Sequence, residues 1–546
     1  METFGDDLET MRRVPLADDH VAAICEIGHE CSYSAGEMVA ELGSAMDRFV
    51  YVIEGEIEVV DPDSGERLLP SSIGPTQFMG EIAFLNGGTH TLAMRAAKAT
   101  RTIEAPREAM LELMARVPEL SDHIITVFSA RRRRTFEENR SGIKLIGADR
   151  DPVIQQCERF LSRNRIPFQS FDLDSSEEEA SRLCTLVDHE PAVIIGKDQP
   201  LENPSPRAIA QALNLDLAIG GDETVDLLIV GAGPSGVAAA VYAGAEGMSA
   251  LVVEDTAIGG QAGTSSRIEN YMGFPTGISG ADLIYRGQIQ ALKFGTRFAM
   301  PRRIEHLSEK ADRTFCATLD DGAQLCARAV LVATGVQYRR LPLDGLDRLE
   351  GAGVFYAATE MEARFCRNTQ AVVVGGGNSA GQAAMYLSRT AKHVHVVVRS
   401  ANLADSMSDY LSRRLEADPR VTVHYGTQVC ALHGEKHLEA ITLATEDGEE
   451  RVETRALFIM IGAAPNTGWL AENIELDDKG FVLTGDAVGR DSSYETSKPG
   501  IFAVGDVRAG SVKRVASAVG EGSVVVSRIW SHVDQIHRSE AIGAAA

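Results

Sequence analysis

Two glycine-rich turns constrain the fold of this chain more than any other feature. The first follows the apolar segment VDLLIV and reads Gly231-x-Gly233-x-x-Gly236, with Pro234 and Ser235 inside the turn. In this pattern the first glycine allows a tight turn, the second leaves bare backbone beside a diphosphate, and the third lets a helix pack closely on its strand. The next apolar strand ends at Glu254, placed to accept hydrogen bonds from a ribose. The sequence predicts a strand–turn–helix dinucleotide site here, with phosphates at the helix N-terminus.

A second copy of the pattern begins at Gln370. It reads Gly375-x-Gly377-x-x-Ala380, with Asn378 and Ser379 in the turn, and its next strand ends at Arg399 instead of a carboxylate. A cation at that position accommodates the 2′-phosphate of NADP, whereas Asp or Glu selects NAD. Arg399 therefore favours NADPH over NADH, unless it is a plain surface charge, which would leave the choice open.

Composition excludes several classes of function. The chain has 546 residues and a formal net charge of −25, which disfavours nucleic acid and anionic lipid surfaces as partners. No uncharged apolar run approaches the roughly 20 residues of a spanning helix, and the acidic N-terminus has no apolar signal core. We therefore expect a cytoplasmic protein with no membrane association. The eight Cys form no CxxC pair, so we predict no metal site, and a disulfide framework is not expected.

Residues 1–135 combine short strands with flanking helices. The order of a short helix, a β-roll and further helices, with Gly80-Glu81 before a short loop, resembles the cyclic nucleotide-binding domain. The resemblance implies that Gly80 and Glu81 bind a ribose, but the phosphate position falls near Thr89 or His90, with no Arg. A degenerate module for interaction or dimerisation is favoured over a tight cyclic-nucleotide site. We expect the run Arg131–Arg134 to be a solvated helix end.

Residues 143–216 read as a compact α/β piece. It resembles a thioredoxin or glutaredoxin fold, but the dithiol position near Asp149–Val153 has no Cys. A second helix is expected over 175–186. We expect Cys157 to be packed, and the module to have no redox activity of its own.

The remainder, residues 222–535, resembles the low-molecular-weight thioredoxin reductases within the FAD/NAD(P) disulfide oxidoreductases. The resemblance rests on both glycine turns, GGQAG, IENYMGFP, AVLVATG and GIFAVGDV. It implies two Rossmann-like domains: an FAD domain in two halves, 222–340 and 460–535, and an NAD(P)H domain over 341–459. It further implies a homodimer. Beyond the two glycine turns and Glu254, the FAD contacts that it implies are Gly260, Gln261, Asn270, Thr334, Gly335, Gly505, Asp506, Val515 and Ala516, with Val515 standing where a Gln is usual.

The dithiol of those reductases is missing. Ala357 and Glu360 stand where the family has its Cys pair, and neither residue performs thiol–disulfide exchange. Cys366 is the nearest thiol. A two-residue turn at Asp321-Gly322 would place Cys316 and Cys326 on opposite faces of a hairpin.

The sequence thus predicts a multidomain FAD-dependent NAD(P)H oxidoreductase that passes electrons to a small-molecule or protein acceptor other than thioredoxin. Its N-terminal domain is expected to regulate it, with a cyclic nucleotide as the candidate ligand. The alternatives are a thioredoxin-disulfide reductase with a non-standard thiol, and a non-catalytic flavin or cyclic-nucleotide sensor.

Overall fold

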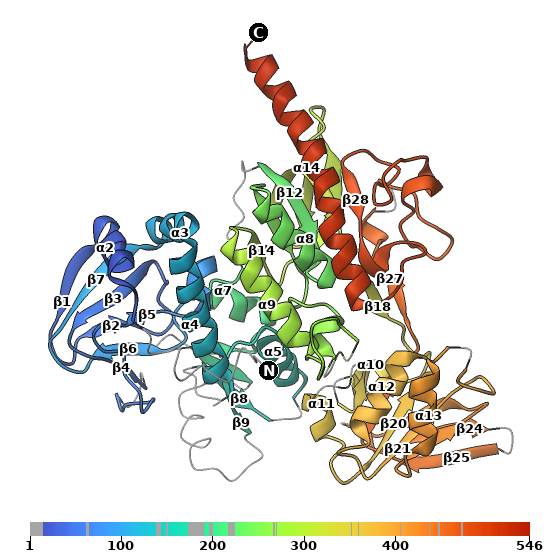
Figure 1. The fold of residues 1–546 in the computed structure, drawn as a ribbon. Helices are drawn as coiled ribbons and strands as arrows, with labels where there is room; N and C mark the ends of the chain where they lie inside the picture. Colours follow the sequence, from blue (N-terminus) through green and yellow to red (C-terminus); the bar gives the residue numbers. More distant parts are fainter. Residues whose placement is uncertain are drawn as a thin grey trace.

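The computed structural model divides into strand-rich units that follow one another along the chain, with both dinucleotide turns in the C-terminal part (Figure 1). In the described residues, no helix combines the length and apolar character needed to span a membrane. The structure describes residues 15–545 except 62–64, 138–142, 149–150, 173–190, 196–199, 217–223, 266–267, 269, 351, 357, 359, 405, 436, 446–447 and 471–472.

The N-terminal unit is a β-roll of two small sheets, ordered β1-β7-β3-β5 and β2-β6-β4. Its core stacks Phe49 on Phe78, with Phe84 and Phe128 packed edge-on against this pair. Phe128 lies on α4, so the last helix of the unit closes the roll. The elements are α2 (Asp18–Ile27), β1 (His29–Tyr33), β2 (Met38–Ala40), β3 (Arg48–Glu54), β4 (Ile57–Val60), β5 (Phe78–Met79), η1 (Ile82–Asn86), β6 (Ala93–Ala96), β7 (Thr100–Pro106), α3 (Arg107–Arg116) and α4 (Pro118–Glu137).

The middle unit is a four-stranded sheet in the order β11-β10-β8-β9, with β8 and β9 parallel and the other pairs antiparallel. Asp151 caps α5 by accepting a hydrogen bond from the N–H of Val153, and Pro152 occupies the first turn. Cys157 is fully buried, as predicted. The helix expected over 175–186 lies outside the described residues, and the thioredoxin-like character of the unit stays a prediction. The elements are β8 (Ile143–Gly147), α5 (Pro152–Arg163), β9 (Gln169–Asp172), β10 (Ala192–Ile195), β11 (Leu201–Glu202) and α7 (Pro206–Ala212).

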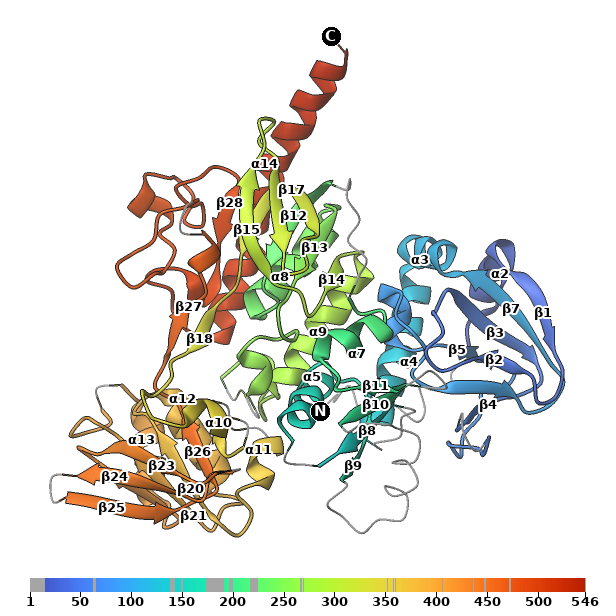
Figure 2. The same cartoon turned by 180° about the vertical axis from the view of Figure 1, so that it is seen from behind.

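The flavin unit, as we call the third unit, has a seven-stranded sheet in the order β14-β13-β12-β17-β16-β15, with β28 paired to β17. Strands β14, β13, β12 and β17 are parallel to one another, so their carboxyl ends meet at one edge of the sheet. Helix α14 packs along α8 behind this sheet (Figure 2). The elements are β12 (Thr224–Val230), α8 (Pro234–Ala245), β13 (Ala250–Val253), η2 (Ala262–Thr264), α9 (Gly280–Lys293), β14 (Arg297–Ala299), β15 (Ile304–Glu309), β16 (Phe315–Leu319), β17 (Gln324–Val332), η3 (Gly468–Leu470), η4 (Gly485–Val488), β28 (Ile501–Ala503), η5 (Gly505–Val507) and α14 (Val515–Ala545).

The nicotinamide unit, as we call the fourth, is inserted into the flavin unit. The antiparallel pair β18 (Val336–Tyr338) and β27 (Ala463–Pro465) forms the connection. Its five-stranded sheet is parallel throughout, in the order β19-β26-β20-β21-β22. The other elements are α10 (Leu346–Leu349), β19 (Val354–Phe355), α11 (Glu360–Arg364), β20 (Gln370–Val374), α12 (Asn378–Leu387), β21 (His393–Val397), α13 (Asp409–Ala417), β22 (Val421–His424), β23 (Gln428–His433), β24 (Ala440–Thr445), β25 (Gly448–Glu453) and β26 (Ala456–Ile459).

The expectation for Cys316 and Cys326 is wrong. The two residues face each other across β16 and β17 and form a disulfide, with Cα atoms 4.1 Å apart. The turn has one residue more than predicted, because Leu319 pairs with Ala323 and Gly322 takes a left-handed φ of +84°. A three-residue loop with a left-handed glycine shifts the register by one residue and brings both thiols to the same face.

Polar contacts join the first two units to the flavin unit. Lys293 at the end of α9 pairs with Asp122 of α4. Arg165 of the middle unit pairs with Asp282 of α9 at 2.6 Å. Both preceding units therefore contact helix α9 of the flavin unit.

Candidate functional site

The first glycine turn forms a cradle whose three glycines have different surroundings. A Cβ added at Gly236 would lie 1.9 Å from the carbonyl oxygen of Gly231, and one at Gly231 would lie 2.5 Å from that of Ala333. A Cβ at Gly233 would meet nothing within 4 Å. The outer glycines are thus required by packing, whereas the middle one borders open space, as a cradle for a diphosphate requires.

Glu254 lies at the end of β13, beside this cradle. Its carboxylate accepts hydrogen bonds from the N–H groups of Ala232 at 2.8 Å, Thr256 at 3.1 Å and Ala257 at 3.2 Å. Burial, reinforced by the neighbouring charge of Asp255, raises the pKa of Glu254 to about 7. The buried carboxylate is thus held against the glycine turn by the backbone.

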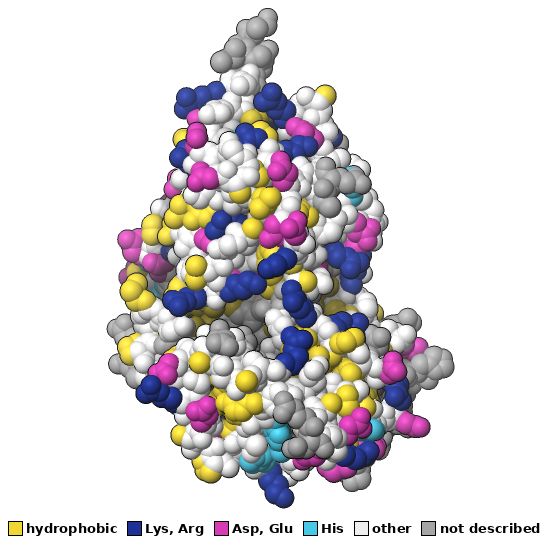
Figure 3. Space-filling model, turned by 90° about the vertical axis from the view of Figure 1, so that its right-hand side faces the viewer, with side chains coloured by type: hydrophobic (Ala, Val, Ile, Leu, Met, Phe, Trp, Pro, Cys, Tyr) yellow, Lys and Arg dark blue, Asp and Glu magenta, His cyan; other side chains and the backbone are white. Residues whose placement is uncertain are grey.

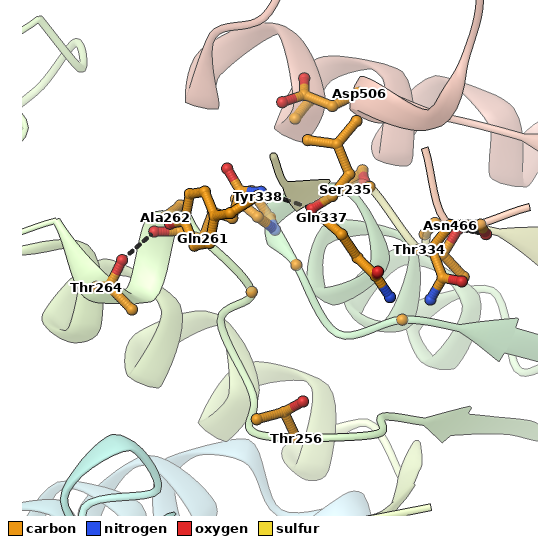
Figure 4. Close-up of a pocket in the computed structure, with 18 of the residues that line it drawn as sticks. Ser235, Thr256, Gln261, Ala262, Thr264, Thr334, Gln337, Tyr338, Asn466 and Asp506 are labelled. Atoms are coloured by element: carbon orange, nitrogen blue, oxygen red, sulfur yellow. Dashed lines mark hydrogen bonds between the residues drawn. The ribbon is translucent and has the colours of Figure 1, made fainter. Parts of the chain in front are cut away.

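The cradle opens into the main cavity, which has a volume of about 620 Å³. Figure 4 shows side chains from several loops of the flavin unit converging on it. Figure 3 shows Lys and Arg side chains gathered around a hollow on one face of the molecule. The predicted residues that line this cavity are Gly231, Gly233, Pro234, Ser235, Glu254, Gly260, Gln261, Thr334, Gly335, Ser379, Asp506 and Val515.

Other predicted residues do not line the cavity. Asn270 and Ala516 are exposed. Gly505 supports the cavity from behind, because a Cβ there would lie 2.6 Å from the hydroxyl oxygen of Ser235. The remaining ones are Gly236, Gly375, Gly377, Asn378 and Arg399.

The second glycine turn repeats the geometry of the first. A Cβ at Gly375 would lie 2.3 Å from the carbonyl oxygen of Met460, whereas the nearest atom to one at Gly377 would be 3.8 Å away. Asn378 fixes the turn by accepting hydrogen bonds from the backbone N–H and the hydroxyl of Ser408, at 2.8 and 2.9 Å. Ser379, the residue after Asn378, lines the main cavity, so the second turn lies at the border of the cavity into which the first cradle opens. Two turns of the dinucleotide-binding type thus border one cavity.

Several lining residues were not found by sequence reasoning. Tyr338 and Tyr356 stack with ring centroids 5.7 Å apart at the link between the flavin and nicotinamide units. Val336 also lines the cavity, and its carbonyl accepts a hydrogen bond at 2.5 Å from Nε2 of Gln261, which was predicted. Arg163 comes from the middle unit. No motif marks these residues, because their positions depend on how the units pack.

No described thiol lines the main cavity. Cys366 is fully buried, and burial raises its pKa to about 12. A thiol that is both buried and protonated is a poor nucleophile. Ala357 lies outside the described residues, and Glu360 is the first residue of α11.

The N-terminal unit has a cavity of its own, which we call the N-terminal pocket, of about 110 Å³ and lined by Gly80, Glu81 and His90. Burial lowers the pKa of His90 to about 4, so this side chain is neutral near pH 7 and supplies no cation. The cations come from α4: Arg132 pairs with Glu81 at 3.1 Å, and Arg131 donates to the carbonyl of Gly80 at 3.0 Å.

The expectation that Arg131–Arg134 is a solvated helix end is therefore wrong for its first two residues. Arg132 is 8% exposed, and Arg131 also lies over the ring of Phe78. Because α4 continues across the mouth of the roll, the buried carboxylate of Glu81 draws Arg132 inward.

Comparisons with known proteins match this architecture. Residues 225–522 match the family described as pyridine nucleotide-disulphide oxidoreductase, and residues 30–117 match the cyclic nucleotide-binding domain. The chain belongs to the pyridine nucleotide-disulphide oxidoreductase family. It is an NAD(P)H-dependent flavoprotein oxidoreductase of the thioredoxin reductase-like type, with a cyclic nucleotide-binding domain at its N-terminus.

The relatives match somewhat more than half of this chain. A thioredoxin reductase of Treponema pallidum is 34% identical over 313 residues, which is 57% of this chain and 98% of the relative. The NADPH-dependent thioredoxin reductase 3 of Arabidopsis thaliana is 33% identical over 56% of this chain and 58% of its own length. The crystal structure of the Lactococcus lactis thioredoxin reductase aligns with a TM-score of 0.53 at 26% identity, over 57% of this chain and 100% of that one.

Proposed function

We propose that this enzyme binds FAD in the first cradle and NADPH in the second, and passes electrons to an acceptor other than thioredoxin. The open space beside Gly233 and the buried carboxylate of Glu254 fit the diphosphate and the adenosine ribose of FAD. Asp506, Gln261 and Thr334 line the cavity beyond them, where they would hold the ribityl chain and the flavin. When bound, FAD supplies the capacity to accept a hydride and to release the electrons onward.

The residues of the chain have positioning roles in this scheme. The stacked pair of Tyr338 and Tyr356 lines the cavity where the two units join, and it would shield a bound flavin from water on that side. Ser379, at the mouth of the second cradle, would orient the nicotinamide end of the dinucleotide. Arg399 is exposed at the end of β21, where it is free to bind the 2′-phosphate of NADPH.

The observation that carries the choice of acceptor is that no thiol lines the main cavity in the part of the chain that the structure describes. Ala357 and Glu360 replace the Cys pair, and Cys366 is buried. The disulfide of Cys316 and Cys326 lies at the start of β17, because Cys326 pairs with Thr224 at the start of β12. The cradle follows the other end of β12, about 20 Å away. A quinone, oxygen, or an iron–sulfur or flavin protein fits better as the acceptor.

Oxidation of NADPH by the purified protein with different acceptors tests this proposal. We expect turnover with ferricyanide or a quinone, and none with a disulfide dye. The relatives named thioredoxin reductase favour the alternative, a disulfide reductase with a non-standard thiol. Dye reduction that disappears in a Cys366→Ser variant would establish that alternative.

The N-terminal pocket supports a regulatory role for the first unit. Arg132 lines both this pocket and a smaller cavity that Tyr285 of α9 and Asn164 of the middle unit share. Asn164 in turn accepts a hydrogen bond from the N–H of Ile258 at 3.3 Å, just before Gly260 of the main cavity. A ligand that binds Glu81 would displace Arg132, and this chain of contacts would pass the change to the flavin site. Binding of FAD would in turn change the affinity for that ligand, because coupling between two sites is reciprocal.

Calorimetry and NADPH oxidation with millimolar cyclic AMP or cyclic GMP test this regulation. We expect binding that changes the rate, and we expect a Glu81→Gln variant to lose both effects. No heat of binding together with an unchanged rate would reject the regulatory role and leave the oxidoreductase proposal intact.

A further inference from the structure

The middle unit places a cation in the main cavity. Arg163, the last residue of α5, lines this cavity together with Glu254 and Gly260. Its Nη2 atom donates a hydrogen bond to the carbonyl oxygen of Gly260 at 3.0 Å. The guanidinium is thus tied to the loop that borders the first cradle.

The loop of Gly260, which accepts the hydrogen bond of Arg163, contacts the first glycine turn. Gly260 has a left-handed φ of +53°, and a Cβ there would lie 3.2 Å from the Cα of Gly233. Gly233 is the bare position of the cradle and the N-cap of α8. The charge of Arg163 also opposes the rise in the pKa of Glu254, which lies at the ribose end of the same cradle. Both observations place the guanidinium beside the turn.

Arg302, Arg303, Lys513 and Arg514 also line the cavity. Lys513 lies over the ring of Phe481, and Arg514 is exposed. Arg302 is buried and pairs with Asp216 and Asp321. Arg303 is 62% exposed and lies 3.7 Å from Glu305. In the part of the chain that the structure describes, the hydrogen bond of Arg163 goes to a neutral carbonyl and no ion pair neutralises it.

These contacts assign a role to the middle unit that does not depend on a dithiol. We propose that Arg163 binds the diphosphate of FAD, so that the middle unit completes the flavin site; this inference rests on the proposed function. The glycine turn offers neutral N–H groups to the diphosphate, whereas an Arg offers a charge-assisted, bidentate contact. Arg163 lies outside residues 225–522, the part of this chain that matches the family, so the contact comes from a unit outside that match.

Binding of FAD to the flavin-free, full-length protein tests the assignment. Hydrogen bonds to charged groups are the strong ones, so we expect an Arg163→Gln variant to bind FAD about 10- to 100-fold more weakly. An Arg163→Lys variant keeps the positive charge but loses the bidentate guanidinium. Its affinity for FAD should therefore lie between those of the wild type and Arg163→Gln. Arg159, one turn earlier on α5, is exposed and does not line the cavity, so an Arg159→Gln variant should match the wild type. Quenching of flavin fluorescence gives each dissociation constant.

Two further readouts separate ligand binding from mere docking of the middle unit. High salt should shrink the difference between the wild type and Arg163→Gln, because screening weakens a charge contact. The unfolding temperature of the flavin-free variant should equal that of the wild type. A variant that binds FAD within about twofold of the wild type would overturn the inference, as would a stability loss that accounts for the weaker binding. A wild-type protein that binds no FAD would instead contradict the proposed function.

Discussion

Glu254 is the residue whose protonation state bears most directly on cofactor binding. Its pKa of about 7 means that about half of the carboxyl groups are protonated at neutral pH in the protein without FAD. Only the ionised form accepts hydrogen bonds from both ribose hydroxyls, so FAD binding releases a proton and its affinity rises as the pH rises through 7.

We therefore expect FAD to bind about tenfold more tightly at pH 8 than at pH 6, as measured by fluorescence quenching. A Glu254→Gln variant cannot ionise and should show a flat profile over the same range. A flat profile in the wild type would contradict the ribose-binding role of this carboxylate.

Arg399 carries the prediction for the choice of dinucleotide. Replacing it with Asp removes a charge-assisted phosphate contact and supplies an acceptor for a ribose diol. We expect the ratio of kcat/KM for NADPH to that for NADH to fall about 10- to 100-fold. Arg389 is exposed on the same unit, so Arg389→Asp controls for the change in net charge. Equal ratios in the wild type and the Arg399→Asp variant would show that Arg399 is an ordinary surface charge.

At the scale of elements, different glycines of the strand–turn–helix cradle serve packing and ligand binding. In Gly236→Ala the new Cβ collides with backbone 1.9 Å away, so we expect a loss of about 1–3 kcal/mol of stability or failure to fold. In Gly233→Ala the Cβ enters open space, so the stability of the flavin-free protein should hold while FAD binding falls. Thermal unfolding and flavin content measure the two effects. Normal flavin content in a stable Gly233→Ala protein would show that the diphosphate of FAD does not lie against this turn.

The elements also show what the sequence could predict and what it could not. Both cradles were predictable, because a glycine turn between a strand and a helix is a local pattern with one physical purpose. The register of Cys316 and Cys326 was not predicted, since one additional loop residue reverses which face a side chain occupies. The contacts of Arg131 and Arg132 with Gly80 and Glu81 were not predicted either. A helix end reads as solvated unless the carboxylate that receives it, here Glu81, is known to lie opposite.

At the scale of the whole molecule, the appended units and the oxidoreductase core share residues at their junctions. Arg163 brings the middle unit to the main cavity, and Arg132 brings the N-terminal pocket to the cavity beside α9. Such placements depend on packing between units, which no single motif encodes. They are the basis of our two proposals for these units: that the middle unit contributes to FAD binding and that the N-terminal unit regulates the enzyme.

Anaerobic titration of the full-length protein with NADPH tests the central claim most directly. A flavin and an exchangeable disulfide each accept two electrons, so an enzyme with both consumes two equivalents of NADPH, and one with flavin alone consumes one. With Cys366 buried and the disulfide of Cys316 and Cys326 remote from the cradle, we predict that one equivalent of NADPH per FAD completes the reduction and bleaches the flavin absorbance. Consumption of two equivalents, falling to one in Cys366→Ser, would contradict the account, as would a flavin that NADPH does not bleach.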